Sequence, residues 1–175
     1  MEIPGLGSLI KDDQWAGYVS GPVSLPILGG IACRIILTGY DGDPRPDDFR
    51  TAVANLLRCP PSVLLDASQH IAHYCEDINS QREAGDPELV PFGTPEDLWR
   101  HVQLGTEIYF SRNDYLDQDI YASIECECDW EPEHGLQIVL HQGLKVTKVG
   151  PYDGHETTAR AYADPTLVGM IYKRI

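Results

Sequence analysis

Basic residues are scarce in this sequence. Its 175 residues include 13 Lys and Arg against 27 Asp and Glu, which gives a formal net charge of −14 at pH 7. Nucleic-acid binding relies on Lys and Arg to neutralise phosphates, so this balance argues against it. Anionic membrane surfaces attract basic segments and are disfavoured for the same reason. A basic protein partner is compatible with the charge, as is a role in solubility alone.

Long hydrophobic runs and a secretory leader are also missing. No run of 18 apolar residues occurs, so we expect no transmembrane helix. The N-terminus, Met1-Glu2-Ile3, lacks a basic stretch followed by an apolar one and is not typical of a signal peptide. The chain has five cysteines, and an odd number without such a leader favours reduced thiols. We therefore expect a cytoplasmic protein.

Several motifs that would indicate an enzyme are absent. The sequence contains no Gly-x-Ser-x-Gly nucleophile turn, no phosphate-binding loop and no dinucleotide-binding glycine motif. Its cysteines include no Cys-x-x-Cys pair, the spacing typical of structural zinc sites. These absences favour a non-enzymatic protein without a cofactor.

The apolar pattern divides the chain into three blocks that no flexible linker separates, which predicts one domain over residues 1–175. Residues 1–40 are expected to be β-rich, residues 46–104 helical and residues 106–173 β-rich again. Strands, then about three helices, then strands indicate an α+β fold with a largely antiparallel sheet. The expected strands cover residues 15–19, 31–37, 106–110, 120–130, 136–140, 144–149 and 167–172.

The acid excess is concentrated between residues 113 and 144, which hold eight Asp and Glu and no Lys or Arg. Strand alternation places Glu125, Glu127 and Asp129 on one face, about 7 Å apart. A solvated sheet face, a partner-binding face and a metal site are alternative interpretations. The opposite face holds Ile120, Ala122, Ile124, Cys126, Cys128 and Trp130, which together resemble a core.

Two sets of side chains have metal-binding chemistry. Cys126 and Cys128 are followed by His134, but the two thiols share their strand face with apolar residues and are expected to be buried. His70 and His73 lie on one helix stripe flanked by carboxylates, where ordinary helix-surface contacts are the simpler interpretation.

Two predicted turns carry the densest polar cluster of the chain. His134 stands before Gly135 in one turn and His155 follows Gly154 in another, with acidic residues around both. Turns of one sheet can converge at one end, so a shared site is conceivable. Polar side chains beside glycine also commonly satisfy turn backbone groups, which is the alternative.

The segments Cys-Asp-Trp-Glu-Pro-Glu-His-Gly at residues 128–135 and Gly-Pro-Tyr-Asp-Gly-His at residues 150–155 resemble a family of uncharacterised bacterial domains of unknown function. The helix start at residues 94–99 fits as well, so the likeness covers roughly residues 94–172. This family provides no catalytic residues to carry over. Small acidic proteins of this kind are similar in type and size to immunity proteins paired with toxins. The resemblance directs attention to Trp130, Glu131, Glu133, His134, Asp153 and His155.

Three functions follow from these patterns, and the first is favoured. The first is a non-enzymatic acidic binding protein of immunity type, which would neutralise a basic partner such as a nuclease toxin. The second is a metal-binding module or metal-dependent enzyme centred on His134, Asp153 and His155, together with Glu131 or Glu133. His70 and His73 on the helix are separate candidate ligands. The third is a self-associating module that forms a homodimer. The candidate partner-binding residues are Glu125, Glu127, Asp129, Trp130, Glu131, Glu133, His134, Asp153 and His155.

Overall fold

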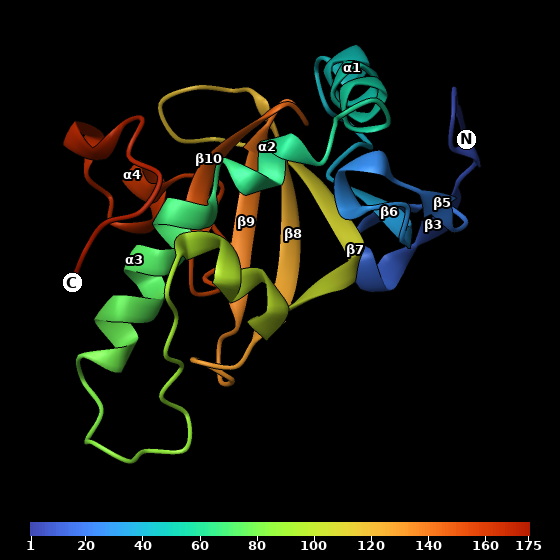
Figure 1. Ribbon diagram of the computed structural model, residues 1–175. Coiled ribbons are helices and arrows are strands. Elements are labelled where there is room, and N and C mark those ends of the chain that lie inside the picture. The colour runs from blue at the N-terminus through green and yellow to red at the C-terminus, as the bar shows by residue number, and fades with distance from the viewer.

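The computed structural model describes all of residues 1–175, and its centre is an eight-stranded sheet (Figure 1). The strand order is β10-β9-β8-β7-β6-β4-β3, and β5 pairs with β6. A separate two-stranded sheet joins β1 (Glu2–Ile3) and β2 (Gly7–Ser8). The strands of the large sheet are β3 (Ile10–Asp12), β4 (Gly17–Val19), β5 (Val23–Ser24), β6 (Ala32–Thr38), β7 (Val102–Arg112), β8 (Ile120–Cys128), β9 (Leu136–His141) and β10 (Lys145–Gly150).

All neighbouring strands of the large sheet are antiparallel except β6 and β7. A parallel pair needs a long crossover, and the helical block between these two strands provides it. That block contains α1 (Pro46–Leu56), α2 (Ser62–Leu65), α3 (Ser68–Asn79) and the 3-10 helix η3 (Pro95–His101). The α+β prediction, with a largely antiparallel sheet and a central helical block, is therefore confirmed.

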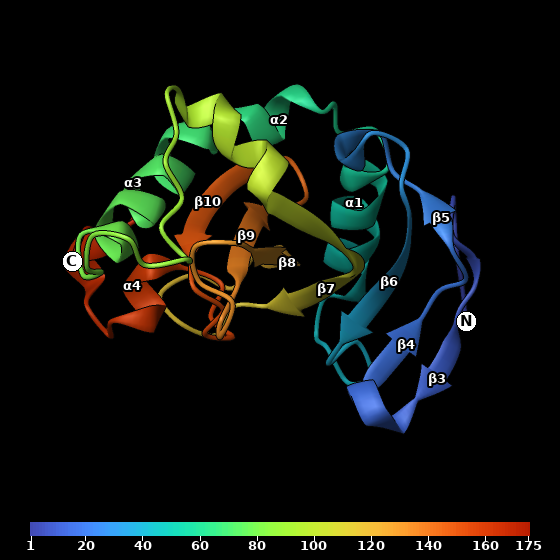
Figure 2. The same cartoon turned by 60° about the horizontal axis from the view of Figure 1, so that its bottom comes forward.

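Short helices complete the two ends of the chain. The 3-10 helices η1 (Asp13–Trp15) and η2 (Pro26–Leu28) interrupt the first strands. The helix α4 (Thr158–Ala161) and the 3-10 helix η4 (Pro165–Leu167) follow β10. Figures 1 and 2 both place the C-terminus beside α3 and α4, and the N-terminus at the opposite end beyond β5.

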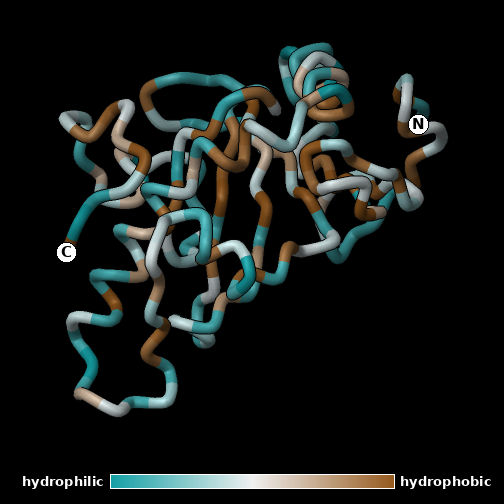
Figure 3. Tube along the Cα trace, in the orientation of Figure 1, coloured by the Kyte–Doolittle hydropathy of each residue, from teal (hydrophilic) through white to brown (hydrophobic).

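The core lies between the helical block and one face of the sheet. Alternate β8 residues from Ile120 to Cys128, together with Trp130, are buried as predicted. They join Phe49 of α1 and Ile71 of α3 in one continuous hydrophobic cluster. Figure 3 shows hydropathy highest along the central strands. All five cysteines are buried and free, which confirms the expectation that these thiols are part of the packed interior.

The expected strand over residues 167–172 is wrong. Pro165 has no N–H to give to a ladder, and Gly169 has a φ of +81°, so the backbone turns instead of extending. One backbone bond reaches the sheet, from Val149 N to Ile171 O at 2.9 Å. The apolar pattern is explained by Tyr172, whose ring lies 5.7 Å from that of Tyr74.

Other element boundaries also differ from the predictions. The second predicted helix is divided into α2 and α3, with residues 66–67 between them. The expected strand at residues 15–19 starts only at Gly17, because Ala16 adopts a left-handed φ of +47° at the end of η1. Strand β7 is four residues longer at its start than expected, beginning directly after η3.

Candidate functional site

The sheet face opposite the core carries a polar groove. Strand register sets Tyr109 opposite Ser123, and Glu125 opposite Gln137, so side chains from three strands share this face. Two adjoining cavities of about 460 and 570 Å³ lie on it. They share Tyr109, Glu125 and Tyr152, so we treat them as one open-face groove. Its first part includes Glu107, Glu127, Glu133 and His134, and its second part includes Trp15, Tyr121, His155 and Glu156.

Two glycines allow the strands around this groove to approach one another. A Cβ on Gly105 would lie 2.0 Å from the carbonyl oxygen of Glu125, at an irregularity in the β7–β8 register. A Cβ on Gly135, where φ is +64°, would lie 2.4 Å from the carbonyl oxygen of Cys126. Neither position can accept another residue without moving the backbone of β8.

The carboxylates of the groove differ in their partners. Glu107 accepts a hydrogen bond from Tyr109 Oη at 2.7 Å and forms an ion pair with Arg34. Glu125 is half-buried, and burial raises its pKa, although a hydrogen bond from Tyr152 opposes the shift. Glu127 and Glu133 are exposed. No Lys or Arg forms an ion pair with Glu125, Glu127 or Glu133. No Lys or Arg lines the groove.

The two histidine-bearing turns meet, as the sequence allowed. Tyr152 N donates to His134 O at 3.2 Å and joins the backbones of the turns. Glu131 accepts from the backbone N of His134 at 2.7 Å and lies 3.1 Å from its Nδ1. The hydrogen bond to this carboxylate raises the pKa of His134. His155 lines the second part of the groove, and its backbone N donates to Asp153 at 2.9 Å.

A buried lysine holds the second of these turns. Lys148 has a side chain that is only 4% exposed, and its Nζ donates to Asp153 Oδ1 and Gln137 Oε1, both at 2.6 Å. Burial lowers the pKa of Lys148, and the Asp153 carboxylate opposes that shift. The register irregularity between Val146 and Lys148 turns Lys148 away from the core face that Val146 occupies and toward Gln137, which plain alternation along β10 did not reveal.

The structure brings together only part of the predicted set of metal ligands. Asp153 is engaged by Lys148, and it does not cluster with His134 and His155. Instead, one ligand atom each from Glu131, Glu133 and His134 lies within 4.8 Å of the others.

The helix stripe around His70 and His73 forms ordinary contacts. Their ring centroids lie 6.3 Å apart, and His73 Nε2 contacts the side chain of Gln69 at 2.9 Å. The flanking Asp77 accepts hydrogen bonds from Tyr172 Oη and from the backbone of Ile175, each at 3.0 Å. This stripe contains no cluster of ligand atoms.

Residues outside the acidic span neutralise part of its charge. Asp114 pairs with Arg160, and Asp129 lies 2.8 Å from His101 Nδ1. Trp130 is fully buried, so it supports the site from the core and is not available to a partner. Glu125, Glu127 and Glu133, which have no Lys or Arg partner, all line the open-face groove, whereas Asp117 and Asp119 lie outside it.

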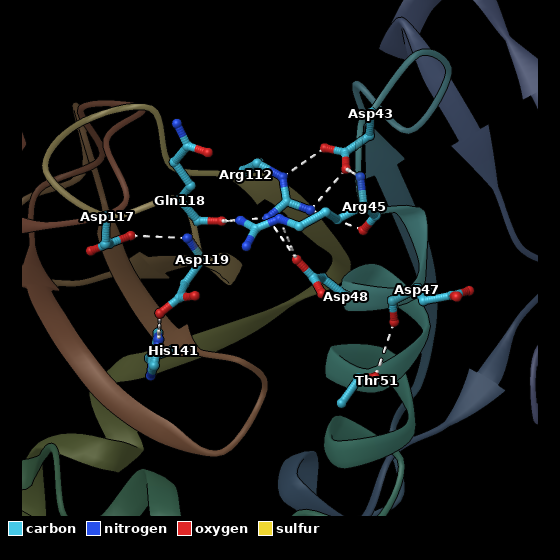
Figure 4. Close-up of polar contacts among 10 residues, drawn as sticks. All are labelled: Asp43, Arg45, Asp47, Asp48, Thr51, Arg112, Asp117, Gln118, Asp119 and His141. Carbon is cyan, nitrogen blue, oxygen red and sulfur yellow. Dashed lines mark hydrogen bonds and ion pairs between the residues drawn. The ribbon is translucent and has the colours of Figure 1, made fainter.

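An arginine network that sequence reasoning missed joins the two halves of the chain (Figure 4). Arg112 binds Asp43 with both Nε and Nη2, at 2.7 and 2.8 Å, and reaches Asp48 with Nη1 at 2.9 Å. It also donates to the carbonyl oxygens of Arg45 and Gln118. In the sequence, residues 41–46 indicate only a break between the first two blocks. The acidic residues of that turn are the one sequence feature that could have pointed to the arginine network.

Comparison with known proteins identifies the family. Residues 5–156 match the family model described as "Domain of unknown function (DUF6985)". The chain belongs to the DUF6985 family. The DUF6985 match extends far into the N-terminal half, beyond the resemblance seen from residue 94 onward, and it contains every groove residue named above. No curated protein and no solved structure gives a match. None of the helices has the length and apolar character needed to cross a membrane.

Proposed function

We propose that this DUF6985 protein is a non-enzymatic acidic binding protein whose open-face groove receives a cationic segment of a partner protein. The observation that carries the proposal is the pairing of unneutralised carboxylates with aromatic rings in one groove. Glu125, Glu127 and Glu133 have no basic partner, while Tyr109 and Tyr152 line the same walls. Carboxylates attract Lys and Arg, and aromatic faces add cation–π attraction.

The finer form of this proposal is a bacterial immunity-type protein that neutralises a basic toxin in the cytoplasm. Its support is the net charge of −14, which accelerates encounter with basic partners at low salt. Five free thiols fit a reducing compartment. The test is protection of growing cells against toxins encoded next to this gene. Absence of protection and of any basic partner in pull-downs would remove this finer form.

The groove itself is tested by calorimetric titration with a six-residue arginine peptide. We expect Glu127→Gln together with Glu133→Gln to weaken binding. Each ion pair contributes about 1 kcal/mol at 4 Å in water, so losing two lowers affinity roughly 10- to 30-fold. Both side chains are exposed, so the fold should be unaffected.

A matched control separates the groove from the overall charge. Glu83→Gln together with Glu96→Gln changes the net charge equally, at exposed positions outside the groove. The control should bind the peptide like the unaltered protein. Equal weakening in both double variants would show that only net charge matters and would contradict the proposed groove.

A second candidate function is supported by one specific observation, the cluster of Glu131, Glu133 and His134 ligand atoms. Carboxylate and imidazole together suit Zn²⁺ or Mn²⁺. A bound ion would compete with the Glu131–His134 hydrogen bond, so loading should lower the pKa of His134 from its raised value. The test is melting with and without Zn²⁺, Mn²⁺ and Ca²⁺. If the melting temperature does not change on addition of any of the three ions, this candidate function is rejected.

A further inference from the structure

Another cavity lies between the loop that joins β7 to β8, the helix α4 and the segment that follows α4. Its volume is about 420 Å³. We call it the C-terminal pocket and define it by Leu116, Asp119, His141, Val168 and Met170, which line it. Tyr121 is the one residue that it shares with the open-face groove. The proposal below is therefore independent of the proposed function of that groove.

The rim of the C-terminal pocket is unusually apolar for a surface. Leu116 and Val168 are 62% and 67% exposed, and Met170 is also exposed. Leu116 has a left-handed φ of +66°, a backbone conformation that rarely carries a leucine. Three large apolar side chains gathered around one cavity form a surface from which a ligand can displace water favourably.

The inner wall of the pocket is acidic. Asp119 Oδ2 lies 2.8 Å from His141 Nε2, and Figure 4 shows the two side chains pointing toward each other. The other oxygen of Asp119 has no hydrogen-bond partner, and its side chain is 42% exposed. Asp117, by contrast, is engaged through both oxygens, by Asn113 and Tyr121.

No basic side chain competes for this wall. The residues that line the pocket include neither Lys nor Arg. Arg160 lies behind the same loop, and it is held by Asp114 and Glu156. Arg45 lines a smaller neighbouring cavity together with Asp119, but it pairs with Asp48 and donates to the carbonyl oxygen of Gln118. The pocket therefore presents an apolar rim and one incompletely satisfied carboxylate, without a built-in cation.

We propose that the C-terminal pocket binds a small amphiphile with a protonated amine head and an apolar body. The amine pairs with Asp119, and the apolar body covers Leu116, Val168 and Met170. The cavity volume falls within the range of small-molecule sites, about 300–1,000 Å³, which are mostly apolar with a few placed polar groups. A neutral or anionic head would leave the carboxylate without a counter-charge.

The test is titration of the intact protein at pH 7 with three probes of equal chain length: n-octylamine, 1-octanol and octanoate. We expect octylamine to bind most tightly and octanoate least. Asp119→Asn should weaken octylamine roughly tenfold and leave octanol unchanged, because it removes only the charge. The control Asp66→Asn makes the same charge change at an exposed position outside the pocket and should have no effect.

The apolar half is tested separately by Val168→Ser, an exposed position where folding is not at risk. It should weaken both octylamine and octanol, whereas Leu65→Ser, at an exposed leucine of α2, should weaken neither. The proposal is overturned if octanol or octanoate matches octylamine, or if Asp119→Asn has no effect. It is also overturned if no probe binds. In that case, disruption of a dimer by Val168→Ser in sedimentation would assign this face to a second copy of the chain.

Discussion

Replacing Trp130 with alanine tests how the acidic strand is anchored to the core. The indole is fully buried and meets the ring of Tyr74 edge-to-face, with centroids 6.0 Å apart. A buried aromatic side chain removes 150–250 Å² from water, and at about 25 cal/mol per Å² this corresponds to roughly 4–6 kcal/mol. Alanine keeps part of this burial, and the expected loss of unfolding free energy is about 3–5 kcal/mol, the usual range for replacing a buried aromatic residue with alanine.

The assay for Trp130→Ala is urea unfolding followed by circular dichroism, with thermal melting alongside. For a domain of this length the loss corresponds to a fall in melting temperature of roughly 6–20 °C. Trp130→Phe is the second variant, in case the alanine protein does not fold. Because Nε1 of Trp130 has no hydrogen-bond partner, phenylalanine loses only packing and should cost less than alanine. A loss below about 1 kcal/mol for Trp130→Ala would refute the core assignment.

Three further variants probe the site and its supports. Arg112→Met leaves the nearly buried Asp43 carboxylate without its partner and should cost about 3–5 kcal/mol by urea unfolding. Arg112 holds the pKa of Asp43 below its ordinary 3.8, so this stabilisation is present above that value and should fade as pH falls below it. Glu125→Gln should stabilise the protein at pH 7, because the raised pKa of Glu125 means that its ionised form costs stability. That advantage should shrink in melts below pH 4.5, where the glutamate is protonated in both states; a gain that persists there would contradict the burial argument. Gly105→Ala should cost about 1–3 kcal/mol, whereas Gly21→Ala, with open space around it, should be nearly neutral.

The strand pattern could be predicted wherever one face was purely apolar. Alternation across Ile120–Cys128 identified the β8 residues that pack into the core, because a shift of one residue would move all of them to the other face. Tyr121, which alternation assigns to that other face, is buried as well. The same logic failed at residues 167–172. The apolar residues there are spaced as in a strand, but the segment pairs with no strand of the sheet. The adjacent residues Ile171 and Tyr172 both pack against the core there, which is not the alternation of a strand.

The candidate site could be predicted only in part. Glu125 and Glu127 were identified because they alternate with core residues on one strand. Glu107 and Tyr109 were missed because their proximity depends on the β7–β8 register, which is a long-range pairing. Lys148 was missed because a bulge in β10 changes the direction of its side chain, and the local sequence pattern does not predict that bulge.

The central claim, that the open-face groove receives a cationic segment, is tested most directly by an amide chemical-shift titration. The six-residue arginine peptide is added to isotopically labelled protein at low salt, and shifted amides are placed on the structure. The account predicts the largest shifts at Tyr109, Glu125, Glu127 and Glu133, which line the groove, and their decline as salt is added. Shifts spread evenly over the acidic surface, or concentrated on the helical face, would contradict it.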